Sequence, residues 1–258
     1  MQHDQDNSER RASVLVITLV LTALGLPGIL SLLPTLPEMP GVPLLALLIN
    51  PLILLALAAL LGAVLAPRCG FRSRIAERVS GHATSLLPQA AWKPLAIGVA
   101  LGIAVTLVDH ALGPLWQSQP QFPPSLVEAW SPAALLIGIL YGGVVEEILM
   151  RWGLMSLLVW VLWRTFARNA QRPSEAVVWT GLVAAAVVFA ASHIPTLVAA
   201  GAEMTLPLII RTIGFNLALG LVFGWIFARS DLESAMLAHV GFHLGVMCAA
   251  IPFRLVSG

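Results

Sequence analysis

Residues 141–155 read YGGVVEEILMRWGLM and lie inside an apolar run that covers residues 132–163. Two adjacent carboxylates and one guanidinium interrupt this run, at Glu146, Glu147 and Arg151. An ionisable side chain at the centre of a bilayer costs roughly 3 kcal/mol or more, so such residues are rare in membrane helices and are usually functional. The stretch therefore predicts a membrane-spanning helix with a polar centre.

The spacing of the three charges separates the two glutamates. On an α-helix, Glu147 and Arg151 are four residues apart, so they share one face and can form an ion pair. Glu146 is turned from Glu147 by about 100°. The carboxylate of Glu147 is then neutralised by Arg151, while the carboxylate of Glu146 remains available for another function. From this helix alone, a purely structural ion-pair network between helices explains the three charges equally well.

The composition is that of an integral membrane protein. Of the 258 residues, 58% are hydrophobic and only 10% are charged, whereas soluble domains contain roughly 25% charged residues. The net charge of +1 gives no indication of nucleic-acid binding. Cys69 and Cys248 are far apart in the sequence, which excludes a disulfide framework and a cysteine-only metal site.

Seven uncharged or nearly uncharged segments are long enough to cross a bilayer. We expect spans at 14–33, 43–66, 94–113, 132–163, 176–200, 206–228 and 232–251. Arginine and lysine occur before the first span and in alternate loops, whereas 34–42, 114–130 and 201–205 contain none. By the positive-inside rule the N-terminus is cytoplasmic and the C-terminus extracytoplasmic. We expect the protein to lie in the cytoplasmic membrane of a bacterium.

We therefore predict an all-α, polytopic bundle that forms one integral membrane domain. Residues 1–130 would contribute the first three helices and a basic cytoplasmic loop, and residues 131–258 the catalytic core. The basic loop, 67–93, is compatible with a short interfacial helix and equally with an ordinary solvated loop.

One difficulty concerns the depth of the site residues in the membrane. Glu146 lies roughly 25 Å from Trp163 and His239 about 10 Å from Leu232, so the fourth helix must project or the seventh must begin inside the membrane.

Three histidines lie in the fifth and seventh spans. His193 follows Phe189 by four residues, and His239 precedes His243 by four, so the last two rings point the same way. A lone buried histidine is more often a satisfied core residue. Three of them together with a glutamate pair, in otherwise apolar helices, predict one shared site.

The residues alone leave three chemistries open. A carboxylate and an imidazole can activate water while imidazole N–H groups stabilise an oxyanion. One glutamate and three histidines also suit zinc, although HVGFH at 239–243 lacks the glutamate of HExxH. Glutamate, histidine and arginine inside a membrane are common as well in proton or cation pathways of transporters.

The order of these residues resembles the CPBP family, which comprises type II CAAX prenyl proteases, bacteriocin-processing enzymes and abortive-infection membrane proteins. The family motifs EExxxR, FxxxH and HxxxN correspond here to residues 146–151, 189–193 and 239–243. The resemblance covers about residues 135–245, and it departs from the family at position 243, where His replaces the usual Asn. It implies an intramembrane endopeptidase with its site between helices 4, 5 and 7, acting on a peptide or membrane-protein substrate, prenylated or otherwise, in the lipid bilayer.

The resemblance also implies roles for the site residues. Glu146 would be the base that activates water, helped by His193, while His239 and His243 would form the oxyanion hole. The supporting residues would be Glu147, Arg151 and Phe189. No cofactor is favoured, but a third histidine keeps zinc open, with Glu146, His193, His239 and His243 as its ligands. The alternative function is an inactive scaffold or immunity protein, or a proton-linked transporter, of the same fold.

Overall fold

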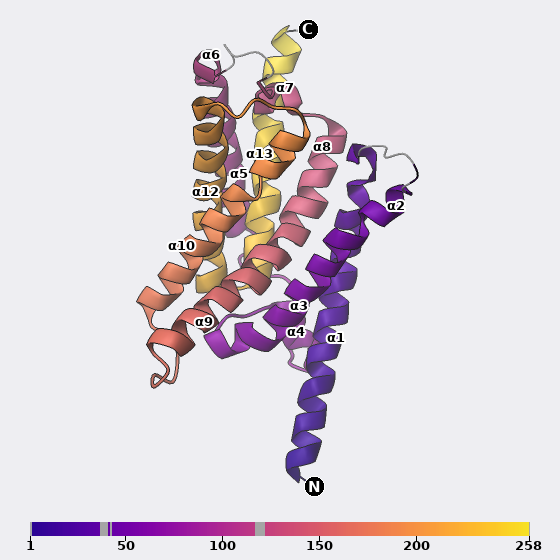
Figure 1. Ribbon diagram of the computed structural model, residues 1–258, viewed down its shortest axis with the longest axis vertical. Helices are drawn as coiled ribbons and strands as arrows, with labels where there is room; N and C mark the ends of the chain where they lie inside the picture. Colours follow the sequence, from indigo (N-terminus) through magenta and orange to yellow (C-terminus); the bar gives the residue numbers. More distant parts are fainter. Residues whose placement is uncertain (1, 37–40, 42, 117–121, 258) are drawn as a thin grey trace.

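The computed structural model describes residues 2–36, 41, 43–116 and 122–257, and every regular element in these ranges is a helix (Figure 1). The first half contains α1 (Gln2–Ser31), η1 (Leu33–Thr35), α2 (Leu44–Leu47), α3 (Ile49–Cys69), α4 (Arg74–Val79), α5 (Trp92–Ala111), α6 (Gly113–Trp116) and α7 (Leu126–Ala129). The second half contains α8 (Pro132–Ile137), η2 (Gly138–Glu146), η3 (Ile148–Met155), α9 (Ser156–Phe166), α10 (Glu175–Ala191), α11 (Ile194–Ala199), α12 (Leu206–Arg229) and α13 (Leu232–Ser257).

Seven helices among the described residues are long and apolar enough to cross a membrane, which confirms the predicted seven spans and the all-α fold. They cover Arg11–Thr35, Leu44–Cys69, Trp92–Ala111, Pro132–Phe166, Glu175–Ala199, Leu206–Arg229 and Leu232–Leu255. The fourth is the longest, with 35 residues.

The fourth span is not a regular α-helix, contrary to expectation. Between α8 and α9 the backbone forms two π-helical segments, η2 and η3. A π-helix closes i→i+5 hydrogen bonds, which widens the turn, and such segments are frequent at functional sites. Here η2 packs against α1 and α13, and η3 packs against α3 and α10. Contacts on opposite sides of the span therefore coincide with the departure from α-helical geometry.

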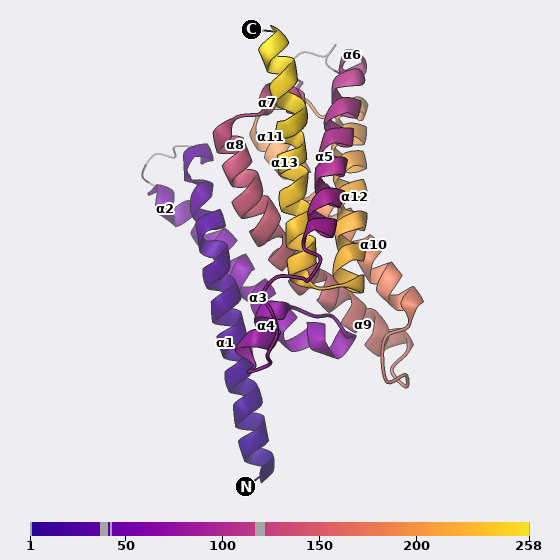
Figure 2. The same ribbon diagram turned by 180° about the vertical axis from the view of Figure 1, so that it is seen from behind.

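Helix α13 packs most closely on α5, and four glycines bring the two backbones together (Figure 2). A Cβ atom at Gly98 would overlap the carbonyl oxygen of Ala238, and one at Gly245 would overlap the backbone of α5. Gly102 and Gly241 are equally crowded by the opposite backbone. Small residues four apart on both helices permit this close approach, as in other membrane helix pairs.

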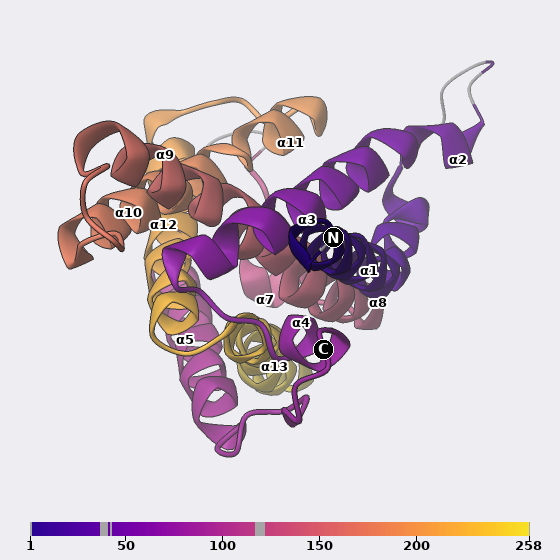
Figure 3. The same cartoon turned by 90° about the horizontal axis from the view of Figure 1, so that it is seen from below.

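The fourth span is inclined relative to α13 (Figure 1), and the polar residues of the two spans meet despite their different distances from the helix ends. In Figure 1 this span crosses the bundle obliquely, and α9 reaches below the level at which α13 begins. The short helix α4 lies at the lower end as well, next to α13 when the bundle is viewed from below (Figure 3). The seventh span begins beside α4, and His239, seven residues further along α13, meets Glu147 in the middle of the fourth span.

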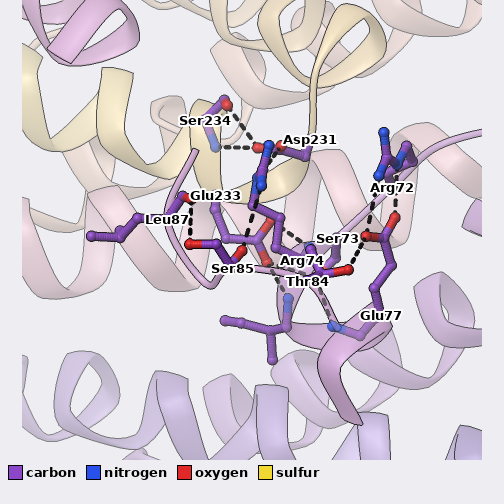
Figure 4. A network of polar contacts seen from close by, with 12 residues as sticks. Arg72, Ser73, Arg74, Glu77, Thr84, Ser85, Leu87, Asp231, Glu233 and Ser234 are labelled. Atoms are coloured by element: carbon purple, nitrogen blue, oxygen red, sulfur yellow. Dashed lines mark hydrogen bonds and ion pairs between the residues drawn. The ribbon is translucent and has the colours of Figure 1, made fainter. Parts of the chain in front are cut away.

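A polar clasp joins α4 to the beginning of α13 (Figure 4). The Glu233 carboxylate accepts hydrogen bonds from the backbone N–H groups of Arg74 and Ile75, at 2.8 and 3.0 Å, and from the Ser73 hydroxyl at 2.7 Å. The guanidinium of Arg74 pairs with Asp231 at 2.6 Å. The basic loop therefore contains a short helix held under the bundle, rather than being a plain solvated loop.

Candidate active site

A cavity of about 510 Å³ lies beside the π-helical part of the fourth span. Glu146, His193, His239 and His243 all line it, so the structure brings together the residues that three separate spans contribute. Further lining residues come from α5, α8, α11 and α12, which means that the cavity involves the third and sixth spans in addition to the three expected.

Glu147 points away from this cavity and is completely enclosed. Its side chain is 0% exposed, that of Arg151 is 3% exposed, and Arg151 Nη1 lies 3.1 Å from Glu147 Oε1. The predicted ion pair is confirmed. The same oxygen of Glu147 also lies 2.8 Å from Nδ1 of His239, a contact that sequence reasoning missed because nothing in the spacing of two distant helices reveals it.

The contact with Glu147 fixes the orientation of the His239 ring. Glu147, paired with Arg151, is a hydrogen-bond acceptor, so Nδ1 of His239 carries the hydrogen. In a neutral ring Nε2 then presents a lone pair, and it lies 3.9 Å from Oε2 of Glu146. The ring is stacked between Phe223 and His243, with centroid distances of 4.7 and 5.2 Å, and these contacts prevent it from turning.

His193 lies just after the end of α10, between that helix and α11. Its Nδ1 is 2.9 Å from the carbonyl oxygen of Phe189, and a carbonyl can only accept, so Nδ1 carries the hydrogen. The ring of Phe189 meets His193 edge-on at 4.9 Å, and the guanidinium of Arg151 lies 4.9 Å from the centroid of the same Phe189 ring. Phe189 thereby packs between the buried ion pair and the cavity.

Two glycines of η2 make room for His243. A Cβ atom at Gly138 would overlap this imidazole, and one at Gly142 would lie 2.8 Å from its Nε2. Within the described part of the chain, Nε2 of His243 is buried without a hydrogen-bond partner. This nitrogen lies beside Gly142 of η2, on a ring that lines the cavity.

The comparison with protein families adds an independent observation. Residues 128–245 match the model of the family described as type II CAAX prenyl endopeptidase Rce1-like. This part of the chain is similar to the Rce1-like family. The matched region contains all three motifs and agrees with the resemblance inferred over residues 135–245. No curated protein and no solved structure matches the chain.

A second buried ion pair lies beside the cavity, and sequence reasoning missed it. Asp109 is 0% exposed and receives two bonds from Arg211, at 2.6 and 2.9 Å. Asp109 also accepts the N–H of Leu126, while Arg211 donates to the carbonyl of Pro124. The sequence could have indicated this pair, because Asp109 and Arg211 carry opposite charges and lie near the ends of two spans that meet on the same side of the bundle. The pair ties the chain before α7 to the cavity wall.

The donor atoms do not fit zinc. No three histidine, cysteine, aspartate or glutamate side chains of the described residues are placed so that they could hold a metal ion. Nδ1 of His193 and Nδ1 of His239 donate to Phe189 and Glu147, so only their Nε2 atoms could bind a metal. Because the side chains of Glu146 and the three histidines do not gather around one point, a tetrahedral set would require these side chains to move.

Proposed function

We propose that the protein is an intramembrane endopeptidase in which Glu146 activates the attacking water. The observation that carries this proposal is the different setting of two neighbouring carboxylates. Glu146 lines the cavity and retains 20% exposure, whereas Glu147 is 0% exposed and bound to Arg151 and His239. A base must reach the proton that it abstracts, and of this pair only Glu146 meets that condition.

The gap between Glu146 and His239 suits a water molecule. A separation of 3.9 Å is too long for a direct hydrogen bond, but a water can donate one hydrogen to the carboxylate and the other to Nε2. Its oxygen lone pair is then directed away from both acceptors. In the proposed step this oxygen attacks the carbonyl carbon of the scissile peptide bond, and its proton moves to Glu146.

The negative charge that develops on the carbonyl oxygen needs a donor. His193 and His239 carry their hydrogens on Nδ1, so in the neutral state neither can donate from Nε2. His243, whose Nε2 has no partner among the described residues, is the donor that we assign to the oxyanion. The resemblance implied that His239 and His243 both stabilise the oxyanion, whereas we assign this role to His243 alone. His239 positions the water, and it could donate a hydrogen bond from Nε2 only if both of its ring nitrogens were protonated. Glu146 finally returns its proton to the leaving amine.

The substrate that we propose is a peptide segment of a membrane-associated protein. The Rce1-like family description favours hydrolysis of a peptide bond, and the mainly apolar lining of the cavity favours an apolar segment over a highly charged one. A purely structural scaffold of the same fold would not need an accessible carboxylate at the position of Glu146. A proton-linked transporter could use one, so a peptidase is separated from a transporter by the cleavage products.

The test compares new protein termini in cells that carry the native protein, Glu146→Gln or Glu175→Gln. Glu175 is an exposed carboxylate that pairs with Arg229 outside the cavity, so its variant is the matched control. We expect a set of cleaved termini that disappears with Glu146→Gln and persists with Glu175→Gln, at equal amounts of folded protein. Identical termini with all three proteins would favour the non-enzymatic alternative.

A further inference from the structure

The two ends of the bundle differ in charge. Most of the cations lie at the end that carries the N-terminus, α4 and α9 (Figure 2); they are Arg68, Arg72, Arg74, Arg78, Lys93, Arg164, Arg168, Arg172 and Arg229. At the opposite end, the described cations are only Arg211, which pairs with the buried Asp109, and Arg254. Cations near helix ends mark the cytoplasmic side, so the end with α6, α7 and α11 is extracytoplasmic.

The cavity extends toward the extracytoplasmic end. Its walls include Leu126 of α7, Thr196 and Leu197 of α11, and Arg211 and Thr212 in the first turns of α12. All of these residues adjoin the loops that lack cations. The reaction centre around Glu146 therefore forms the inner limit of a cavity whose other walls lie beside the extracytoplasmic loops.

The cytoplasmic end below the reaction centre is filled. Trp152, Met155, Phe223 and Phe227 are each 1% exposed or less. The ring of Phe227 packs on Phe71 at 4.9 Å, and the polar clasp between α4 and α13 lies beyond them. Two further cavities near the basic end, one beside Arg11 and Arg68 and one beside Cys69 and Arg229, share no lining residue with the cavity at Glu146.

We infer that the reaction centre is reached from the extracytoplasmic side, and that the substrates are polypeptide segments exposed on that side of the membrane rather than cytosolic tails. This inference rests on the proposed function for its substrate class, but the direction of access stands on the charges and the packing alone. It assigns to the site the translocated parts of membrane or exported proteins.

Cysteine labelling tests the direction of access without requiring activity. In full-length protein carrying Cys248→Ala, the remaining Cys69 is buried. Thr196→Cys and Asn216→Cys place a thiol in the cavity, and Asn169→Cys places one in the exposed α9–α10 loop at the basic end. With a membrane-impermeant maleimide on intact cells, we expect the two cavity thiols to react and Asn169→Cys to react only after permeabilisation.

Two results would overturn the inference. Cavity thiols that react only after permeabilisation would place the opening on the cytoplasmic side, and cavity thiols protected under both conditions would show that the cavity does not admit the reagent from either side. The termini experiment separates this inference from the proposed function. Cleavage that depends on Glu146 but falls in cytosolic segments would contradict the direction of access and support the peptidase activity. Labelling as expected without any cleavage would support the direction of access and contradict the peptidase activity.

Discussion

Glu147 has two partners that sequence reasoning would assign to separate tasks. Its carboxylate closes the buried ion pair with Arg151 and also accepts the Nδ1 hydrogen of His239. The i, i+4 spacing predicts the first contact because both residues lie on one helix. The second depends on how the fourth and seventh spans pack, which no local pattern encodes. Stability and the orientation of a cavity imidazole therefore depend on one side chain.

We predict that Arg151→Ala and Glu147→Gln each destabilise the protein by about 3–5 kcal/mol, because removing one partner strands the other in a low-dielectric interior. Arg229→Ala is the control, since it removes an exposed pair with Glu175 and surface pairs contribute little. The measurement is thermal unfolding in detergent. The double variant Glu147→Gln/Arg151→Met, which leaves no stranded charge, should unfold at a higher temperature than Arg151→Ala. Unchanged melting of both single variants would contradict the pairing.

Position 243 distinguishes the glutamate mechanism from a metal mechanism. We predict that His243→Asn retains most of the activity, because the side-chain amide can still donate to an oxyanion, whereas His239→Asn loses it together with the bond to Glu147. Chelators should leave the native activity unchanged. Stoichiometric zinc in the purified protein, inactivation by chelation and loss of activity in the His243→Asn variant would together require a metal ligand set.

The elements illustrate which local structure a sequence can specify. The length of each hydrophobic segment predicts each span. Glycines four residues apart, at 98 and 102 and at 241 and 245, also indicate close pairing of two membrane helices. The π-helical geometry of η2 and η3 was not readable, since the same residues form a regular α-helix by propensity. The neighbours of these segments, α1 and α13 for η2 and α3 and α10 for η3, come from distant parts of the sequence.

We predict that Gly98→Ala impairs both stability and activity, because its methyl group would overlap the carbonyl of Ala238 and displace the backbone of α13. Gly214→Ala is the matched control: Gly214 also lies in a spanning helix, and nothing lies within 4 Å of a Cβ atom built there. Its replacement should be neutral or stabilising by roughly 0.5–1 kcal/mol. Melting temperature and cleavage rate are measured for both variants. Equal values for Gly98→Ala and Gly214→Ala would show that neither stability nor activity depends on the close approach of α5 and α13.

At the scale of the whole molecule, hydropathy and charge alternation were sufficient for the number of spans, because each span is a local property of the chain. The convergence of Glu146 and the histidines on one cavity was expected as well, from polar residues that must avoid lipid. The Asp109–Arg211 pair and the Glu233 clasp were not expected, because each joins segments more than 100 residues apart.

The seven spans and the charge alternation together predict opposite locations for the two termini. A reporter that is active only in the cytoplasm should work when fused after Arg229 and should fail when fused to the C-terminus, while a reporter active only outside should behave in the reverse manner. Activity of the cytoplasmic reporter at both fusion points would mean that α13 does not cross the membrane, and the seven-span topology would be wrong.

The Glu233 clasp has a consequence for biosynthesis. The chain is synthesised from its N-terminus, so α4 leaves the ribosome long before its partner, which is 159 residues further on. Until the last span arrives, the amides of α4 have no carboxylate to bind, and neither His239 nor His243 is present beside Glu146. Docking of α13 supplies both the carboxylate of the clasp and the two histidines of the cavity. Under the proposed mechanism, the nascent chain would therefore be inactive toward its neighbours in the membrane until its last span is in place.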